Sequence, residues 1–228
     1  MSASAFPLHT AIVMDGNGRW ATARGRPRIF GHRAGASAVR RTVEAARHLG
    51  LPVLTLFAFS SDNWERPRTE VSALFVLFRE FLEAETARCR DEGIRLEIIG
   101  RRDRLPARVL QAVERAEAMT AASSAMRLRV AVDYSAREAI AAAAHRLSPT
   151  SRAPRDDLAR LIGGPDVDLL IRTGGEQRLS DFLLWEAAYA ELVFLDVPWP
   201  EFGRDHLEGA LHEFARRQRR FGRIAAAV

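Results

Sequence analysis

The sequence predicts a single-domain α/β protein with a mainly parallel six-stranded sheet flanked by helices. Short apolar runs rich in β-branched residues alternate with longer segments of helical periodicity, and this alternation is typical of βαβ units. The 228 residues, 47% of them hydrophobic and 28% charged, suit one globular domain with a substantial core. Because no repeat or low-complexity tract interrupts the chain, we expect one domain over residues 1–228.

The expected strands and helices follow one another along the whole chain. Strands are predicted at residues 10–14, 53–60, 94–99, 128–132, 167–172 and 192–195. Helices are predicted at residues 34–49, 70–92, 106–121, 136–146, 180–189 and 205–219. Turn residues separate the elements: Gly50 and Pro52 precede the second strand, and Gly93 precedes the third. Residues 147–155 are predicted to form a turn-rich loop within the domain.

The helix predicted at residues 70–92 has a marked apolar stripe. Thr69 stands in the capping position, and apolar residues then recur at helical spacing. The stripe consists of Val71, Leu74, Phe75, Phe78, Phe81 and Leu82, and it is widened by Ala73 and Leu77. The pattern fits a half-buried helix, and the wall of an apolar tunnel is the alternative.

Composition excludes several kinds of chemistry. The chain has 34 basic residues and a net charge of +5, and every basic residue is arginine. The absence of lysine excludes a Walker A nucleotide site and a Schiff base. Cys89 is the only cysteine, which excludes an internal disulfide and a cysteine-cluster zinc site. No signal-peptide pattern or apolar run of ~18 residues occurs. We therefore expect a cytoplasmic location, with peripheral membrane association left open.

Polar and charged residues collect where the predicted strands end. The loops concerned are Asp15-Gly16-Asn17-Gly18-Arg19, residues 60–64 with Arg66, Asp133-Tyr134, and residues 172–180. Because the carboxyl ends of parallel strands share one edge of a sheet, and ligands bind at that edge, we expect these loops to form one site.

The first of these loops combines a carboxylate with features that bind anions. Its two glycines let the backbone approach a ligand closely, and Arg19 supplies a guanidinium fork for phosphate oxygens. Asp15 would repel such an anion unless a divalent cation, most commonly Mg²⁺, bridged them. An ordinary turn is the alternative explanation for these residues.

The loop at residues 172–180 supplies a second candidate anion site. Arg172 and Arg178 flank a Gly-Gly turn, and Ser180 is expected to be the N-cap of the helix predicted at residues 180–189. A helix N-terminus favours anions. Two anion sites on one sheet edge predict a pair of phosphate-bearing substrates.

A set of longer motifs points to a known family. The motifs are Met14-Asp15-Gly16-Asn17-Gly18-Arg19-Trp20, Gly31-His32-Arg33-Ala34-Gly35, Phe59-Ser60-Ser61-Asp62-Asn63-Trp64 with Arg66-Pro67, Asp168-Leu169-Leu170-Ile171-Arg172-Thr173-Gly174-Gly175-Glu176, Arg178-Leu179-Ser180-Asp181-Phe182-Leu183-Leu184-Trp185, and Tyr189-Ala190-Glu191-Leu192. In kind and order they resemble the cis-prenyltransferases, the undecaprenyl diphosphate synthase family, from about residue 8 to residue 222. The resemblance implies magnesium-dependent condensation of isopentenyl diphosphate with an allylic diphosphate, farnesyl or geranyl, with a new cis double bond at each addition.

The resemblance also implies a role for each matching residue. Asp15 is expected to bind Mg²⁺ and to act in catalysis, Asn63 to position a proton transfer, and Glu191 to be a second magnesium-linked carboxylate. The allylic diphosphate site is implied for Gly16, Asn17, Gly18, Arg19, Trp20, Arg28, His32, Ser60, Trp64 and Arg66. The isopentenyl diphosphate site is implied for Arg172, Arg178 and Ser180. The tunnel is expected to be lined by Ala58, Leu74, Phe75, Phe78 and Met126.

Some positions depart from the family pattern. Many members have histidine where this chain has Gln177, so no role of that histidine is assumed here. Asp62 replaces a common glutamate, and Tyr134-Ser135-Ala136-Arg137 replaces Tyr-Gly-Gly-Arg. These changes leave the expected reaction class unaltered.

Product length and partners are expected from the same resemblance. Small Ala58 favours medium or long products and the phenylalanines favour shorter ones, so we expect a product longer than C15, with C50–C55 favoured and a short-chain synthase as the alternative. Arg220-Phe221-Gly222 resembles a terminal element that reaches the partner's active site in a homodimer. The product is expected to partition to membranes.

A basic module that binds RNA or an anionic membrane is a distant alternative. It predicts arginines on one face with stacking aromatic residues. The informative arginines of this chain instead lie in glycine loops beside carboxylates, so we expect no nucleic-acid partner.

Overall fold

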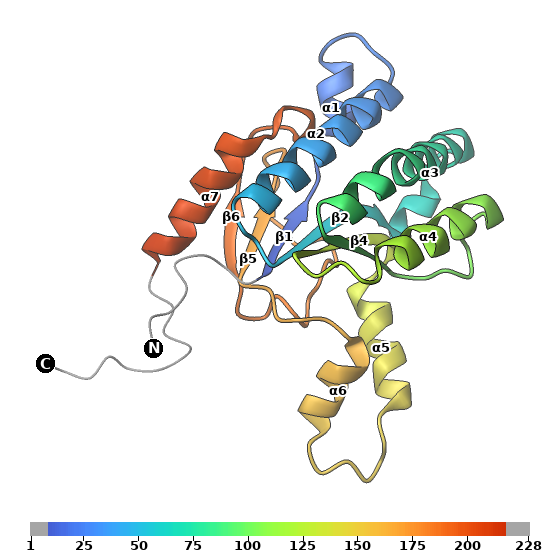
Figure 1. Cartoon of the computed structure of the whole chain (residues 1–228), viewed down its shortest axis with the longest axis vertical. Coiled ribbons are helices and arrows are strands. Elements are labelled where there is room, and N and C mark those ends of the chain that lie inside the picture. Colours follow the sequence, from blue (N-terminus) through green and yellow to red (C-terminus); the bar gives the residue numbers. More distant parts are fainter. Residues whose placement is uncertain (1–8, 218–228) are drawn as a thin grey trace, which may run out of the picture.

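The computed structural model describes residues 9–217 (Figure 1). Within them, six strands form one sheet in the order β3-β4-β2-β1-β5-β6, and all neighbouring strands are parallel. The strands are β1 (His9–Val13), β2 (Val53–Ser60), β3 (Ile94–Ile99), β4 (Met126–Tyr134), β5 (Leu169–Arg172) and β6 (Glu191–Phe194). The predicted six-stranded sheet is confirmed, and each predicted strand boundary lies within two residues of the observed one.

Helices flank the sheet on both sides. They are α1 (Asn17–Thr22), α2 (Arg28–His48), α3 (Arg68–Asp91), α4 (Ala107–Thr120), α5 (Ala136–Arg146), α6 (Pro154–Ile162) and α7 (Arg204–Arg216), with the 3₁₀ helices η1 (Ser61–Glu65) and η2 (Trp199–Glu201). Helices α7, α2, α3 and α4 lie side by side, in this spatial order, along one face of the sheet (Figure 1). Helices α5 and α6 pack on each other at the opposite side. None of the helices in residues 9–217 has the length and apolar character needed to cross a membrane.

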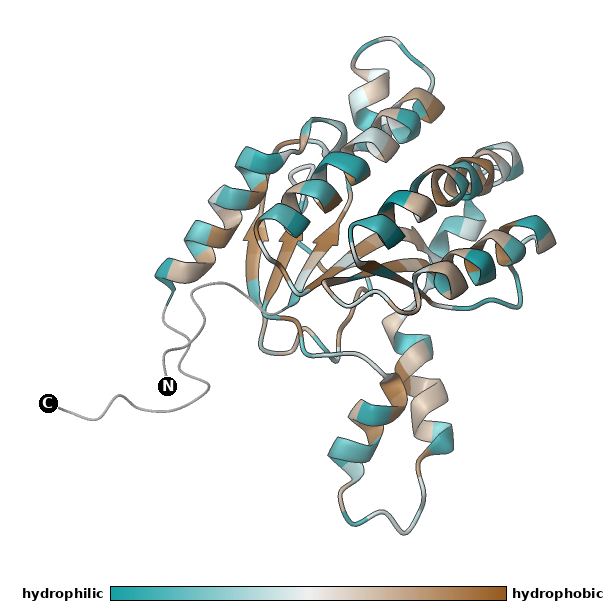
Figure 2. Ribbon diagram, in the orientation of Figure 1, coloured by the Kyte–Doolittle hydropathy of each residue, from teal (hydrophilic) through white to brown (hydrophobic). Residues whose placement is uncertain are grey.

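The core consists of two apolar clusters, one on each face of the sheet. Along β1, Ile12 belongs to the larger cluster, under the long helices, while Ala11 and Val13 belong to the smaller one. This assignment follows from the strand period of two residues. Figure 2 shows the strands as predominantly hydrophobic ribbons, as expected for a parallel sheet that is covered on both faces.

Helices α2 and α3 begin earlier than the sequence predicted, whereas α4 begins one residue later than predicted. Pro27, Pro67 and Pro106 are the N-caps of α2, α3 and α4. Proline fits this position because its ring fixes φ near the observed values of −50° to −56° and its missing N–H is not needed there. Thr69 is therefore not the cap of α3. The earlier start of α2 places Arg28 and His32 within a helix.

The prediction of a helix at residues 180–189 is wrong, because this segment forms turns. Ser180 and Asp181 have φ values of 50° and 61°, in the left-handed region that a right-handed helix excludes. The carboxylate of Asp181 accepts the backbone N–H of Arg137 at 3.0 Å and the hydroxyl of Ser135 at 2.5 Å, so it binds the start of α5. Ser180 is consequently not a helix N-cap.

Two short helices were not predicted from the sequence. α6 begins within the loop expected at residues 147–155, with Pro154 in its first turn. α1 begins within the glycine-rich loop after β1 and packs tightly on α2, since a Cβ atom on Gly31 would lie 1.9 Å from the carbonyl oxygen of Asn17. Tertiary packing rather than helix propensity therefore accounts for α1.

Candidate active site

A polar cavity lies at the carboxyl ends of β1, β2 and β5. The predicted site residues that line it are Asp15, Gly16, Asn17, Gly18, Arg28, His32, Ser60, Asn63, Arg66, Arg172 and Ser180. Loops that are far apart in the sequence thus meet at one sheet edge, as the strand order requires.

Asp15, which follows β1, is fixed by contacts with Gly16 and with the end of β5 and the loop that follows it. Its backbone N–H donates to the Thr173 hydroxyl at 3.0 Å, and its carbonyl accepts that hydroxyl at 2.8 Å. Its carboxylate accepts the N–H of Gly16 at 2.5 Å and Nη2 of Arg172 at 2.9 Å. The side chain remains 31% exposed, so a carboxylate oxygen can be reached from the cavity.

The surroundings of Asp15 favour its ionised form. Burial alone would raise the pKa of this carboxyl group, but the hydrogen bonds from Arg172 and Gly16 and the positive charges of Arg172 and Arg19 outweigh burial and lower the pKa. Asp15 is therefore a carboxylate at neutral pH.

Arg172 ends β5 and is only 4% exposed. Its Nη1 donates to the Ser180 hydroxyl at 2.7 Å and to the carbonyl of Arg178 at 2.5 Å, and its Nη2 donates to Asp15. These contacts hold the guanidinium in place. Within the described residues its Nε has no hydrogen-bond partner.

Two glycines allow the loops after β1 and β5 to touch. Gly16 and Gly174 have φ values of 96° and 82°, which disfavour a residue with a side chain. A Cβ atom on Gly174 would lie 3.0 Å from the backbone nitrogen of Gly16, and one on Gly16 would lie 2.9 Å from Pro198. Backbone contact between the loops therefore sets the separation of Asp15 and Arg172.

A second charged cluster lies on the α2 and α3 side of the cavity. The Glu70 carboxylate lies 3.4 Å from Nε of Arg28, 3.1 Å from Nη1 of Arg66 and 3.5 Å from Nε2 of His32. Burial opposes ionisation of Glu70, but the neighbouring arginines and His32 lower its pKa. Burial and the charges of Arg66 and Arg28 outweigh Glu70 and lower the pKa of His32, so the imidazole is neutral at pH 7.

The η1 segment presents Ser60 and Asn63 to the cavity through a capping box. The backbone N–H of Ser60 donates to Oδ1 of Asn63 at 3.1 Å, and the Ser60 hydroxyl accepts the N–H of Asp62 at 3.2 Å. This reciprocal pairing fixes the orientation of the Asn63 amide.

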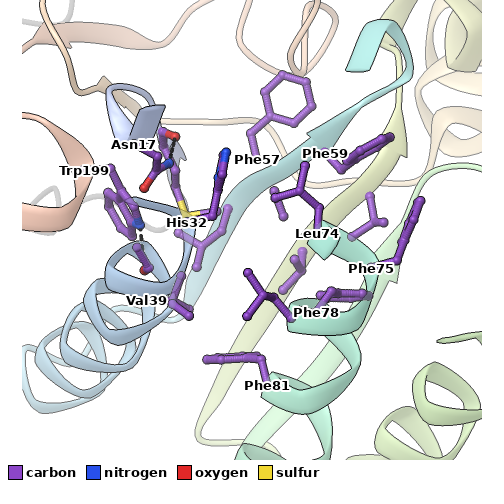
Figure 3. A pocket seen from close by; sticks show the side chains of 18 residues that line it. Asn17, His32, Val39, Phe57, Phe59, Leu74, Phe75, Phe78, Phe81 and Trp199 are labelled. Atoms are coloured by element: carbon purple, nitrogen blue, oxygen red, sulfur yellow. Dashed lines mark hydrogen bonds between the residues drawn. The ribbon is translucent and has the colours of Figure 1, made fainter. Parts of the chain in front are cut away.

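An apolar pocket adjoins the polar cavity between α2, α3 and β2. Its cavity volume is about 130 Å³, and Figure 3 shows Val39 of α2 across it from Phe78 and Phe81 of α3. The predicted tunnel residues Ala58, Leu74, Phe75 and Phe78 line it. The residues that line both the pocket and the cavity are Met14, Asn17, His32, Phe57, Ala58, Phe59 and Leu74.

Several predicted site residues lie outside the polar cavity. Arg19 is 55% exposed and lies 3.4 Å from Asp15. Trp20 donates its indole N–H to Glu201 at 2.8 Å, and Trp64 donates its own to Asp133 at 2.9 Å. Arg178 is exposed and paired with Glu176. Arg220-Phe221-Gly222 lies beyond the residues that the structure describes.

Glu191 and Asp15 are not brought together within one chain, so the role of Glu191 as a second magnesium-linked carboxylate stays a prediction. Glu191 begins β6 in register with Leu169, which is in register with Thr10 of β1. It therefore lies towards the amino edge of the sheet, whereas Asp15 follows the carboxyl edge. Its carboxylate accepts Nη1 of Arg217 at 3.0 Å.

Met126 is also not where the sequence analysis expected it. It is 2% exposed in the larger core cluster, at the beginning of β4. The lining of the apolar pocket reaches β4 only further along, at Val130 and Val132. Met126 therefore contributes to the core rather than to the pocket.

Sequence reasoning missed three residues that shape the site: Glu70, Thr173 and Trp199. Glu70 was interpreted only as the start of a helix. The Trp199 backbone N–H donates to the Asp15 carbonyl at 2.9 Å and its indole N–H to the Gly35 carbonyl at 2.9 Å. The only available signal for Thr173 was its place directly after Arg172 at a strand end.

The described residues contain no cluster of three or more His, Cys, Asp or Glu side chains that could hold a metal ion by themselves. A metal at this edge of the sheet could take ligands from Asp15 together with a bound substrate. Mg²⁺ is commonly bound in this way, by one or two carboxylates together with substrate phosphates.

The fold, with a charged cavity joined to an apolar pocket at one sheet edge, is that of a prenyltransferase. The family model described as "Putative undecaprenyl diphosphate synthase" matches residues 13–222. The chain belongs to this family of cis-prenyltransferases, and the expected prenyltransferase class is confirmed.

Curated relatives agree with this assignment. Isoprenyl transferase 1 of Bradyrhizobium diazoefficiens is 52% identical over 232 residues, covering 100% of this chain and 94% of the relative. The isoprenyl transferase of Chromobacterium violaceum is 47% identical, covering 96% of this chain and 89% of the relative.

Solved structures share the fold. Lavandulyl diphosphate synthase from Lavandula x intermedia, in complex with dimethylallyl diphosphate, has a TM-score of 0.91 at 32% identity, covering 96% of this chain and 99% of that chain. A probable undecaprenyl diphosphate synthase from Campylobacter jejuni has a TM-score of 0.81 at 29% identity, covering 98% of this chain and 100% of that chain.

Proposed function

We propose that this prenyltransferase elongates a prenyl chain by condensing isopentenyl diphosphate with an allylic diphosphate, with farnesyl diphosphate as the primer. The continuity of the polar cavity with the apolar pocket is the observation that carries the proposal. Seven residues line both spaces, so an amphiphile can place its diphosphate among the arginines and its hydrocarbon between α2 and α3. Burial of the hydrocarbon supplies binding free energy in proportion to its apolar area.

In the proposed reaction, the allylic carbon–oxygen bond breaks and the diphosphate departs with the electron pair. The π electrons of the isopentenyl double bond form the new carbon–carbon bond, and a proton then leaves the adjacent carbon. Arg28 and Arg66 would stabilise the charge on the leaving group. Arg172 and Ser180 would hold isopentenyl diphosphate, and Asn63 would orient the group that accepts the proton.

Magnesium fits one part of this arrangement. Asp15 is ionised, partly exposed and close to the guanidinium groups that would bind phosphate, so its carboxylate is a suitable ligand alongside phosphate oxygens. When bound, Mg²⁺ would neutralise charge on the diphosphate. Glu191 does not fit the same site within one chain.

We propose a product longer than C15, with C50–C55 favoured. A short-chain product is the second candidate, because Phe75, Phe78 and Phe81 occupy the pocket wall and the lavandulyl diphosphate synthase structure is so similar in fold. The motif resemblance further supports a homodimer, and we propose a cytoplasmic location and release of the product to membranes.

One assay tests the proposed function. We expect magnesium-dependent incorporation of labelled isopentenyl diphosphate into butanol-soluble lipid, and a loss of at least about a hundredfold in Asp15→Ala. An exposed substitution, Arg137→Ala on α5, serves as the matched control and should leave incorporation unchanged. Absence of incorporation by the wild-type protein with farnesyl, geranyl and dimethylallyl primers would reject the proposal, and chromatography of the products separates the two chain-length candidates.

A further inference from the structure

Asp133 is a completely buried carboxylate that has no place in the proposed reaction. It lies near the end of β4, is 0% exposed, and is absent from the lining of the polar cavity. Its φ of 51° is in the left-handed region, which costs free energy for a residue with a side chain. A strained, buried charge persists only where its surroundings hold it.

Arg104 and Trp64 hold this carboxylate. Arg104 donates through Nε to Oδ2 at 2.9 Å and through Nη2 to Oδ1 at 2.5 Å, which makes a bidentate pair. The indole N–H of Trp64 donates to Oδ1 at 2.9 Å, and the Arg104 guanidinium lies 5.6 Å from the centre of the Trp64 ring. The arginine supplies the charge that allows a buried carboxylate to accept the indole N–H.

Trp64 is the anchor of η1. No residue of this segment is buried. The Trp64 ring packs 5.6 Å from the ring of Phe59 and 5.2 Å from that of Phe75, and both phenylalanines line the apolar pocket. Asn63, the preceding residue, lines the polar cavity. One side chain therefore connects the buried carboxylate with both parts of the site.

We propose that Asp133, neutralised by Arg104, is a positioning residue that fixes Trp64 and thereby sets the place of Asn63 in the cavity. This inference rests on the proposed function, since Asn63 acts there. Without the hydrogen bond, η1 is retained by the aromatic contacts of Trp64 and by the Ser60–Asn63 capping box, and the segment that carries the Asn63 amide shifts as a unit relative to the cavity. A displacement of this kind lowers kcat, because the transition state needs a fixed geometry.

Trp64→Phe tests the proposal, because it removes the indole N–H and keeps an aromatic ring against Phe59 and Phe75. We expect kcat to fall on the order of tenfold with the KM for the allylic primer little changed. In the Asn63→Ala background the same substitution should cause no further loss, since the positioning acts through Asn63. Trp185→Phe, the same exchange outside the cavity, is the matched control and should leave kcat unchanged.

A pair of substitutions at Asp133 gives a second measurement that does not depend on Trp64. Asp133→Asn keeps an oxygen that can accept the indole N–H, and we expect kcat within about threefold of the wild type. Asp133→Leu removes that oxygen and should lose as much kcat as Trp64→Phe. Thermal unfolding of each variant identifies any loss that is due to unfolded protein.

The outcomes are distinct. If the wild-type protein incorporates no isopentenyl diphosphate, the proposed function fails. If the wild type is active and Trp64→Phe retains full kcat, or loses kcat to the same extent with and without Asn63, the positioning role is overturned. Equal kcat in folded Asp133→Asn and Asp133→Leu also overturns it.

Discussion

Replacing Arg172 with methionine tests how the two glycine loops are held together. Methionine has a similar length and suits a buried position, but it removes the positive charge and the donors. The substitution eliminates the hydrogen bonds to Asp15, Ser180 and the carbonyl of Arg178, at 2.9, 2.7 and 2.5 Å. It leaves Asp15 with the N–H of Gly16 and the nearby charge of Arg19.

The expected loss of stability follows from these contacts. Hydrogen bonds to charged groups contribute about 1.5–3 kcal/mol each, and breaking a fully buried ion pair costs about 3–5 kcal/mol. Because Asp15 is 31% exposed, water compensates part of this, and we expect the free energy of unfolding to fall by about 2–4 kcal/mol. For a chain of this size the melting temperature should fall by roughly 5–15 °C. As a control, Arg137→Met makes the same exchange at an exposed arginine and should change the melting temperature little.

The pH dependence gives a sharper test. In the wild type the folded pKa of Asp15 lies below its ordinary value of 3.8, so its contribution to stability is present above that pH and is lost as pH falls through the folded pKa. In Arg172→Met, Arg172 no longer opposes the effect of burial on Asp15, so the pKa of Asp15 should rise. Urea unfolding at pH 7 and pH 3 should show that the difference in the free energy of unfolding between the wild type and Arg172→Met becomes smaller at the lower pH. An equal gap at both pH values, with an unchanged Asp15 titration by carboxyl NMR, would refute the reasoning.

Two other predictions concern the core and the pocket. Burial and the charge of Arg129 lower the pKa of His9 from 6.5 to about 4, so the unfolding free energy should decrease by about 3 kcal/mol as pH falls from 6.5 to 4. Urea unfolding measured between pH 6.5 and 4 should show this decrease in the free energy of unfolding, and His9→Gln should abolish it. Phe78→Ala enlarges the apolar pocket and should lengthen the product, whereas Val76→Ala, on the exposed side of α3, should not; identical products by chromatography would contradict this.

The sheet was predictable because its determinants are local. Each strand is a short apolar run with turn residues at its ends, and burial on both faces of a parallel sheet requires that pattern. The turns at Ser180 and Asp181 were not predictable in this way. Asp181 leaves the helical conformation to bind the start of α5, and this partner is far away in the sequence. α1 likewise depends on close packing against Gly31.

The candidate site was predictable to the extent that it follows strand ends. Asp15, Asn63 and Arg172 met in one cavity because parallel strands place their carboxyl ends together. Residues that reach the cavity from helices or from another face carried no such signal. Glu70 looked like an ordinary first-turn carboxylate, and the contact between Asp133 and Trp64 depends on the pairing of β2 with β4.

The structure changes what the arginines of the site imply. They are paired with protein carboxylates: Arg172 and Arg19 with Asp15, Arg28 and Arg66 with Glu70, and Arg19 and Arg178 with Glu176. Five arginines and three carboxylates leave a network with only two net positive charges. In the proposed reaction a diphosphate must therefore compete with these carboxylates, and its attraction to the site is weaker than the number of arginines suggests. A divalent cation on Asp15 would convert one competing carboxylate into a shared ligand, which gives the proposed magnesium dependence a physical reason.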